Sequence, residues 1–110
     1  MLRVMGATFE ALAHEVRRDI LERLRSGPST VNGLAESLSA SQPLISKHLR
    51  VLRDAGFVTV SVDAQKRWYR LRPEAFTEVA AWLEPYRWMW DGRLDLLGDQ
   101  LDEMKAQEEQ

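Results

Sequence analysis

Hydrophobic residues recur every three or four positions through the first half of the chain, which predicts a series of short amphipathic helices. The pattern places helices near residues 5–13, 15–25, 31–38 and 42–55. Each is short, so its stability depends on burying its apolar stripe against the others. The second helix has the clearest stripe, formed by Val16, Ile20, Leu21 and Leu24.

The boundaries of these helices carry signals of their own. Thr30 and Ser41 each precede a helical segment, and their hydroxyls can accept hydrogen bonds from backbone N–H groups of the first turn. Pro43 falls in the first turn of the fourth helix, where its missing N–H costs nothing. Gly27 and Gly56 are expected to end the second and fourth helices.

The hydrophobic period then changes from 3.6 to 2, which predicts a β-hairpin directly after the fourth helix. Residues 57–62 alternate between apolar and polar side chains, residues 63–66 have the composition of a turn, and residues 67–71 form the return strand. Because two strands alone are marginally stable, we expect Trp68 and Tyr69 to pin the hairpin to the helices.

Helical periodicity returns over residues 73–104. A break is expected near Glu84-Pro85, because a proline inside a helix removes a hydrogen bond and clashes with the preceding turn.

Charge is distributed unevenly over the 110 residues, although the formal net charge is only −2. Residues 1–72 carry 12 Lys/Arg and 7 Asp/Glu, a balance of +5, whereas residues 73–110 carry 3 and 10, a balance of −7. A basic first part favours a polyanionic partner. We interpret the acidic tail as a solvated face that stays away from that partner.

Composition excludes several classes of protein. The chain has no cysteine, so disulfides, thiolate metal sites and thiol redox sensing are ruled out. No run of about 18 apolar residues occurs, so we expect a cytoplasmic protein that does not span or bind a membrane. No nucleophile–base pair, phosphate-binding glycine loop or metal cluster is evident, so we expect neither an enzyme nor a cofactor.

Two short helices joined by a tight turn and followed by a hairpin are typical of a winged helix-turn-helix that binds double-stranded DNA. The fourth helix has one apolar face and one polar face. Gln can contact adenine and Lys can contact guanine in the major groove, while cations near the hairpin tip can neutralise phosphates. The predicted contacts are Ser41, Gln42, Ser46, Lys47, Arg50 and Arg53 on the helix, and Lys66 and Arg67 on the hairpin.

The stretch LAESLSASQPLISKHLRVLRDAGFV, residues 34–58, resembles the recognition segment of the ArsR family of winged helix-turn-helix repressors. Residues 9–21 resemble the opening helices of that family, and the wing ending in Trp68-Tyr69-Arg70-Leu71 also matches. The resemblance covers about residues 5–83.

The resemblance implies a mainly α fold with a small β-hairpin, in a homodimer held by its first and last helices. It also implies binding to a pseudo-palindromic operator and repression of transcription, including that of its own gene. One domain would span residues 1–110, with a DNA-binding core over 5–72, a wing over 57–71 and dimerisation helices over 73–104. It assigns the recognition role to Ser41, Gln42, Ser46, Lys47 and His48, and the wing contact to Lys66 and Arg67.

The chain departs from the metal-sensing members of that family. Their third helix carries a cysteine-containing motif, whereas residues 31–35 here are VNGLA. Other members use Asp and His on the last helix, which has no histidine here. His14 lies at a helix junction, where capping or exposure is expected, and His48 can pack or contact a phosphate. We therefore predict no metal site.

Aromatic residues gather around Pro85, and leucines follow them at heptad-like spacing. We interpret them as a dimer interface, because large aromatic side chains dominate interface energetics. An apolar pocket for a small organic effector remains open as an alternative. The predicted interface consists of Phe9, Leu12, Trp82, Tyr86, Trp90, Leu94, Leu97 and Leu101.

The sequence therefore predicts a homodimeric, sequence-specific DNA-binding repressor. A winged-helix module that binds another protein and no DNA remains the alternative, since fold alone does not fix function. DNA affinity that weakens steeply with salt would separate the two, because phosphate contacts release counterions.

Overall fold

A computed structural model of the chain describes residues 2–92, with side chains from Gly6 onward. The predicted interface residues Leu94, Leu97 and Leu101 lie outside the described residues. The chain divides into two compact units, Met1–Val79 and Ala80–Gln110, which are described separately below.

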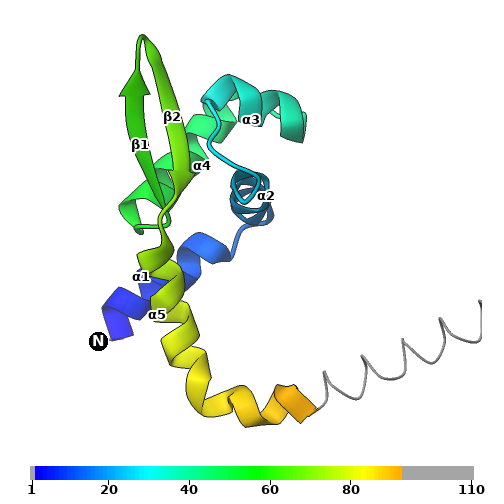
Figure 1. Cartoon of the computed structure of the whole chain (residues 1–110), viewed down its shortest axis with the longest axis vertical. Coiled ribbons are helices and arrows are strands. Elements are labelled where there is room, and N and C mark those ends of the chain that lie inside the picture. The colour runs from blue at the N-terminus through cyan, green and yellow to red at the C-terminus, as the bar shows by residue number, and fades with distance from the viewer. Residues whose placement is uncertain (1, 93–110) are drawn as a thin grey trace, which may run out of the picture. The chain divides into compact units, whose positions relative to one another are not determined.

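The first unit contains the four predicted helices in the predicted order (Figure 1). They are α1 (Leu2–Leu12), α2 (Glu15–Leu24), α3 (Val31–Leu38) and α4 (Gln42–Asp54). Amphipathic stripes on α2, α3 and α4 allow these three helices to pack on one another.

Both predicted N-caps are confirmed. Thr30 Oγ1 accepts from the Gly33 N–H at 3.1 Å, and Ser41 Oγ accepts from the Leu44 N–H at 3.3 Å. Gly56 has a φ of 84° just after the end of α4, a conformation that only glycine adopts without strain.

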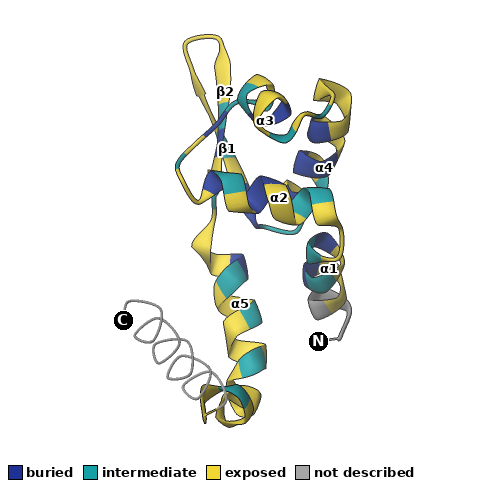
Figure 2. Ribbon diagram, turned by 90° about the vertical axis from the view of Figure 1, so that its right-hand side faces the viewer, coloured by how far each residue is buried: buried dark blue, intermediate teal, exposed yellow. Residues whose placement is uncertain are grey.

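The hydrophobic core gathers where α2, α3 and α4 meet, as the buried residues in Figure 2 show. The predicted stripe of α2 is confirmed for Ile20, Leu21 and Leu24, while Val16 is only partly buried. On α1 the buried residues are Thr8 and Ala11. The apolar members of the core are Ala11, Ile20, Leu21, Leu24, Leu34, Ala35, Ile45, Leu49, Leu52, Phe57, Val58, Tyr69 and Ala75.

The wing is an antiparallel pair of strands, β1 (Val58–Asp63) and β2 (Lys66–Leu71), joined by a two-residue turn. The predicted alternation holds only at its base: Val58 is buried, but Val62 is 68% exposed, because the tip extends past the helices.

Tyr69 attaches the wing to the loop before α3. Its backbone N–H donates to the Ser29 carbonyl at 2.8 Å, and its carbonyl accepts from the Ser29 N–H at 3.0 Å. Its side chain is buried, so its predicted anchoring role is confirmed. Trp68 points to the other face of the strand and is only half-buried.

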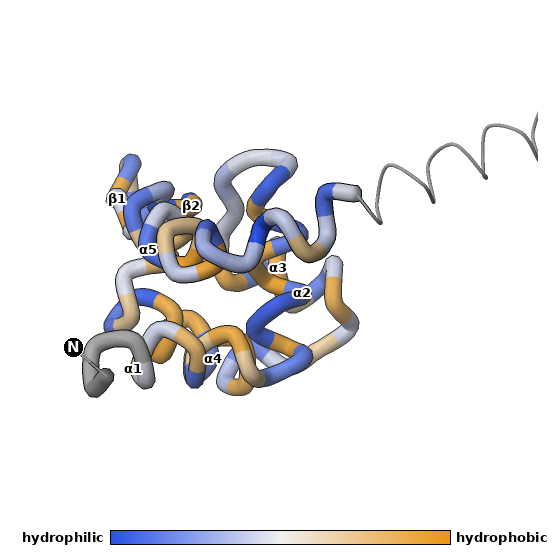
Figure 3. The backbone as a smooth tube through the Cα atoms, turned by 90° about the horizontal axis from the view of Figure 1, so that it is seen from below, coloured by the Kyte–Doolittle hydropathy of each residue, from blue (hydrophilic) through white to orange (hydrophobic). Residues whose placement is uncertain are grey.

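Helix α5 (Pro73–Leu83) follows the wing. The expected break is confirmed: a 3₁₀ turn, Glu84–Tyr86, follows α5, and residues 87–92 are helical again. Hydrophobic and hydrophilic stretches alternate along the helices (Figure 3), and no described helix is long and apolar enough to cross a membrane.

Candidate nucleic-acid interface

The polar face of α4 is open to solvent along its length. Its apolar face buries Ile45, Leu49 and Leu52 against the other helices. The predicted contacts on the opposite face are all exposed, namely Ser41, Gln42, Ser46, Lys47, Arg50 and Arg53. Backbone and side-chain donors are thus presented together at the beginning of a helix, which is the arrangement that DNA readout requires.

A tight turn holds α4 against α3. Ser39 ends α3 with a φ of 53°, in the left-handed region. The next N–H, that of Ala40, donates to the Ala35 carbonyl at 3.0 Å. This closes the helix end and allows α4 to begin two residues later, at Gln42, after the Ser41 cap.

An open groove of about 540 Å³ runs between α4 and the wing. Arg50 and Arg53 line it from α4, and Arg67 lines it from β2 together with the buried Tyr69. Asp54 contributes the one acidic side chain of the lining. The fold therefore brings three predicted DNA-binding arginines from two elements into one concave surface.

A second hollow, of about 310 Å³, lies between the wing tip and the beginning of α3. Lys66 and Arg67 line it from the wing, and Thr30 and Asn32 line it from the other side. Both predicted wing cations thus border a concave surface beside a helix instead of standing on an isolated hairpin.

The cations of this interface form no ion pairs with the described part of the chain. Among residues 6–92, no acidic side chain forms an ion pair with Lys47, Arg50, Arg53, Lys66 or Arg67. The ion pairs of the described side chains involve other arginines, such as Arg25 with Glu22 and Arg72 with Glu74. A polyanion would therefore meet these side chains without first breaking an ion pair to a described carboxylate.

His48 corrects one sequence-based expectation. The resemblance assigned it a recognition role, but its side chain is only 3% exposed and cannot reach DNA in this structure. Position 48 lies three residues after Ile45 and four before Leu52, on the buried stripe of α4. The alternative interpretation, a packing role, is confirmed.

The surroundings of His48 favour its neutral form. Burial lowers the pKa of His48 below its ordinary value of 6.5, and the nearby His14, Arg17 and Lys47 lower it further. Arg17 Nη1 lies 3.3 Å from His48 Nδ1. Because a guanidinium can only donate, Nδ1 accepts, and the imidazole proton lies on Nε2.

This lowered pKa predicts a stability that depends on pH. Between the folded-state pKa and the unfolded value of 6.5, the unfolded chain binds the additional proton, so the free energy of unfolding falls as pH falls. The contribution of His48 is complete above 6.5 and is lost once pH passes below the folded-state pKa. Urea unfolding between pH 5 and 8 measures it, with His48→Asn as the comparison. Parallel curves for the two proteins would contradict the prediction.

His14 caps α2, as its position at the helix junction predicted. Its Nδ1 accepts from the Val16 N–H at 3.1 Å, and its side chain is exposed. Within the described residues, no three side chains of the His, Asp or Glu type gather as a metal site would need.

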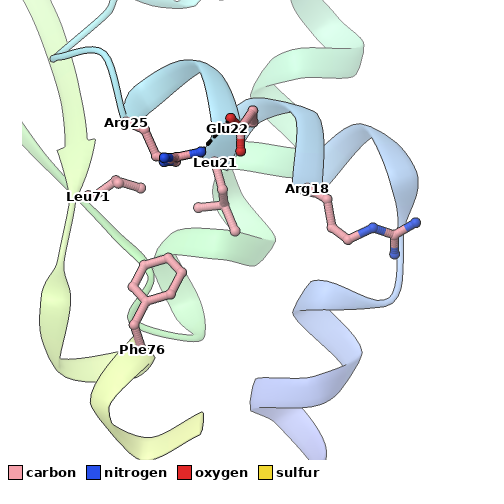
Figure 4. Close-up of a pocket in the computed structure, with 6 residues that line it drawn as sticks. All are labelled: Arg18, Leu21, Glu22, Arg25, Leu71 and Phe76. Carbon is pink, nitrogen blue, oxygen red and sulfur yellow. Dashed lines mark hydrogen bonds and ion pairs between the residues drawn. The ribbon is translucent and has the colours of Figure 1, made fainter. Parts of the chain in front are cut away.

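A hollow of about 360 Å³, which the hydrophobic pattern of the sequence does not predict, lies between α2, β2 and α5. In Figure 4, Leu21, Leu71 and Phe76 point into it, whereas Arg25 turns to its ion-pair partner Glu22. Helix α2 lies far from β2 and α5 in the sequence, so periodicity within one segment gives no signal of the hollow. The only sequence signal for this hollow is an apolar side chain, Phe76, placed shortly after the wing.

The predicted dimer residues are partly accessible. On α1, Phe9 and Leu12 are half-buried, and Leu12 packs against the core. In the second unit, Trp82 and Tyr86 are exposed with their ring centroids 5.4 Å apart, and Trp90 is half-buried. Trp88 and Met89 are also exposed there.

Comparison with known proteins places this architecture in a family. The family model for bacterial regulatory proteins of the ArsR family matches residues 14–60. Over 79 residues, the chain is 30% identical to the transcriptional repressor SdpR of Bacillus subtilis, covering 72% of this chain and 88% of SdpR. It is 43% identical over 65 residues to the HTH-type transcriptional regulator Rv2034 of Mycobacterium tuberculosis, covering 59% of this chain and 61% of that relative.

A crystal structure of an ArsR family transcriptional regulator superposes with a TM-score of 0.72 at 33% identity, covering 83% of this chain and 94% of that one. The match to Rv2034 spans less than two thirds of that relative's length. Fold, matched motif and relatives agree, and the chain belongs to the ArsR family of bacterial regulatory proteins.

Proposed function

We propose that the protein is a homodimeric transcriptional repressor that binds a pseudo-palindromic operator in double-stranded DNA. Helix α4 would lie in the major groove, and the wing would lie on the phosphate backbone. The observation that carries the proposal is the groove between α4 and β2, which gathers Arg50, Arg53 and Arg67 beside the exposed Gln42 and Lys47. Family membership supports it.

The exposed side chains divide into two roles. Gln42 and Lys47, in the first half of α4, are suited to base edges, because an amide pairs with adenine and an ammonium reaches guanine. The arginines of the groove and Lys66 of the wing are suited to phosphates, which fix the position on the duplex without reading its sequence.

A second copy would complete the interface with DNA. A two-fold dimer places two recognition helices on half-sites about one helical turn apart, roughly 34–36 Å, which matches a pseudo-palindrome. The accessible apolar side chains Phe9, Leu12, Trp82, Tyr86 and Trp90 are the proposed contacts. Sedimentation at twice the 12.7 kDa chain mass is the expected result, and a persistent monomer would contradict it.

The hollow between α2, β2 and α5 is the place where we propose that a small organic effector binds, because Leu21, Leu71 and Phe76 give it an apolar lining that three charged side chains border. A ligand that raises the melting temperature of the wild type but not of Phe76→Arg would support this location. A ligand that stabilises both proteins equally would place the effector site elsewhere.

Fluorescence anisotropy across a salt series tests the DNA-binding function. The first duplex is the DNA just upstream of the protein's own coding region, since autoregulation would place an operator there, and the second is a random duplex. We expect the upstream DNA to bind at least about a hundredfold tighter, with a steep salt slope. Weak and equal binding to both would favour the alternative, a winged-helix module for a protein partner.

Replacing Gln42 and Lys47 by alanine should remove the preference for the operator over random DNA while leaving the dimer intact. Each side chain that reads a base is worth about 1–3 kcal/mol of discrimination, so the double variant should lose most of it. Asp19→Ala is the control, because Asp19 is exposed on α2, outside the groove. An unchanged preference in the double variant would show that α4 does not read the bases.

A further inference from the structure

Arg17 connects the end of α1 to the recognition helix. Its Nε donates to the Ala11 carbonyl at 2.8 Å, and its Nη2 donates to the Glu10 carbonyl at 3.0 Å. These carbonyls belong to the last turn of α1, where the regular helical N–H donors run out, and the Glu10 carbonyl also accepts from the Ala13 N–H at 3.1 Å. The planar guanidinium is therefore fixed in orientation before it meets any other group.

The remaining nitrogen of this guanidinium faces α4. Nη1 lies 3.3 Å from Nδ1 of the buried His48, a contact that spans 31 positions of sequence. The His48 imidazole also lies against His14, with ring centroids 4.3 Å apart. His48 sits directly after Lys47 and two residues before Arg50, so a shift of the α4 backbone at His48 displaces the DNA-facing side chains beside it.

We infer that Arg17 is a positioning residue for DNA binding: through its hydrogen bond to neutral His48, it fixes the recognition helix to the end of α1, and protonation of His48 releases that contact. The inference rests on the proposed DNA-binding function. Arg17 itself need not touch DNA, since its guanidinium is engaged with α1 and His48.

The charged and titratable groups around His48 mean that protonation of its imidazole would disrupt the contact with Arg17. Arg17 faces it from α2, His14 faces it from the junction before α2, and Lys47 is its neighbour on α4. A proton on Nδ1 would turn the acceptor into a donor opposite the Arg17 guanidinium. It would also place a new positive charge among these cationic and titratable groups, with little water to screen it.

The expected effect of acid on DNA affinity is opposite in sign to the effect that the added positive charge on His48 would have by itself. An additional positive charge near DNA strengthens binding, because DNA is a polyanion. If protonation releases Arg17, DNA affinity falls as pH falls toward and below the folded-state pKa of His48, which lies below its ordinary value of 6.5. One linked proton limits this fall to about tenfold per pH unit.

Two substitutions isolate the Arg17 contact at pH 7.5. Arg17→Gln removes the donor to His48, whereas Arg18→Gln removes a neighbouring arginine that caps the same helix by donating to the Leu12 carbonyl at 2.8 Å. We expect Arg17→Gln to weaken operator binding about tenfold and Arg18→Gln less than about threefold. Equal losses would reduce Arg17 to a helix cap and overturn the inference.

The dependence of DNA affinity on pH distinguishes this inference from a purely structural role of Arg17, which would not change that dependence. In His48→Asn, the amide Oδ1 can accept from Arg17 but cannot titrate. We expect this variant to keep its affinity at pH 7.5 and to show a flatter profile between pH 5 and 7.5 than the wild type, with circular dichroism checking folding at each pH. A wild-type affinity that rises with acid, or identical profiles for the two proteins, would overturn the inference.

A measurement without DNA separates this inference from the proposed function. Nitrogen-15 NMR of the wild type should show His48 as the tautomer protonated on Nε2. The titration midpoint of His48 should rise in Arg17→Gln, which loses a neighbouring positive charge, and stay in place in Arg18→Gln. If the midpoint does not move, the inference fails. If it moves but no duplex is bound at any pH, it is the proposed function that fails.

Discussion

Replacing Arg50, Arg53 and Arg67 together by glutamine is expected to weaken the salt dependence of DNA binding by the amount that corresponds to the loss of about three phosphate contacts. Each neutralised phosphate adds about 0.9 to the slope of log affinity against log salt, so the slope should fall by about 2.7. These side chains line one groove from two elements and form no ion pair with any described side chain. Affinity should drop on the order of a hundredfold at moderate salt.

The loss should be nearly the same for operator and random DNA, because phosphates carry no sequence information. This separates the groove arginines from Gln42 and Lys47, whose replacement should remove the preference instead. Anisotropy titrations of both duplexes at four or more salt concentrations measure slope and preference together.

Three other arginines provide a control with the same change in charge. Arg70 lies on the same strand as Arg67 but on its other face, where it donates to Ser61 Oγ at 3.3 Å. Arg72 and Arg87 are exposed and paired with carboxylates. Their joint replacement by glutamine should leave the slope nearly unchanged. Equal effects of the two triple variants would mean that net charge, and not the groove, determines binding.

The sequence could predict features that depend on neighbours along the chain. The stripe of α2, the caps Thr30 and Ser41, and the break before Pro85 all follow from periods and local hydrogen bonds. The polar face of α4 belongs to the same class, since burial of Ile45 on one face determines what the opposite face exposes.

The remaining features depend on contacts between distant segments. The family resemblance assigns His48 to DNA contact, whereas its spacing from the apolar residues of α4 places it on the buried face. Only the fold shows that Arg17 is its partner. Val62 continues the alternation of apolar and polar residues but is exposed, because the tip of the wing extends past the helices. The pattern of a strand does not show how far the helices that cover it reach.

Phe57 was predicted to begin the wing, and the structure gives it a larger role. It precedes β1, is fully buried, and packs edge-on against Phe76 of α5 with ring centroids 5.0 Å apart. Its N–H donates to the Leu52 carbonyl at 2.9 Å, and its carbonyl accepts from the Arg72 N–H at 2.8 Å. One residue thus joins the end of α4, the base of the wing and the beginning of α5.

Phe57→Ala is therefore expected to lower the free energy of unfolding by about 3–5 kcal/mol, the cost of removing a buried phenyl ring and leaving a cavity. Small domains have only about 5–15 kcal/mol in total, so a large fraction of the stability would be lost. Val62→Ala is the matched control on the same hairpin. Its side chain is 68% exposed, and the change should stay within about 0.5 kcal/mol. Urea unfolding followed by circular dichroism measures both. A loss below about 1 kcal/mol for Phe57→Ala would mean that the wing and α5 are not held to the helices through this ring.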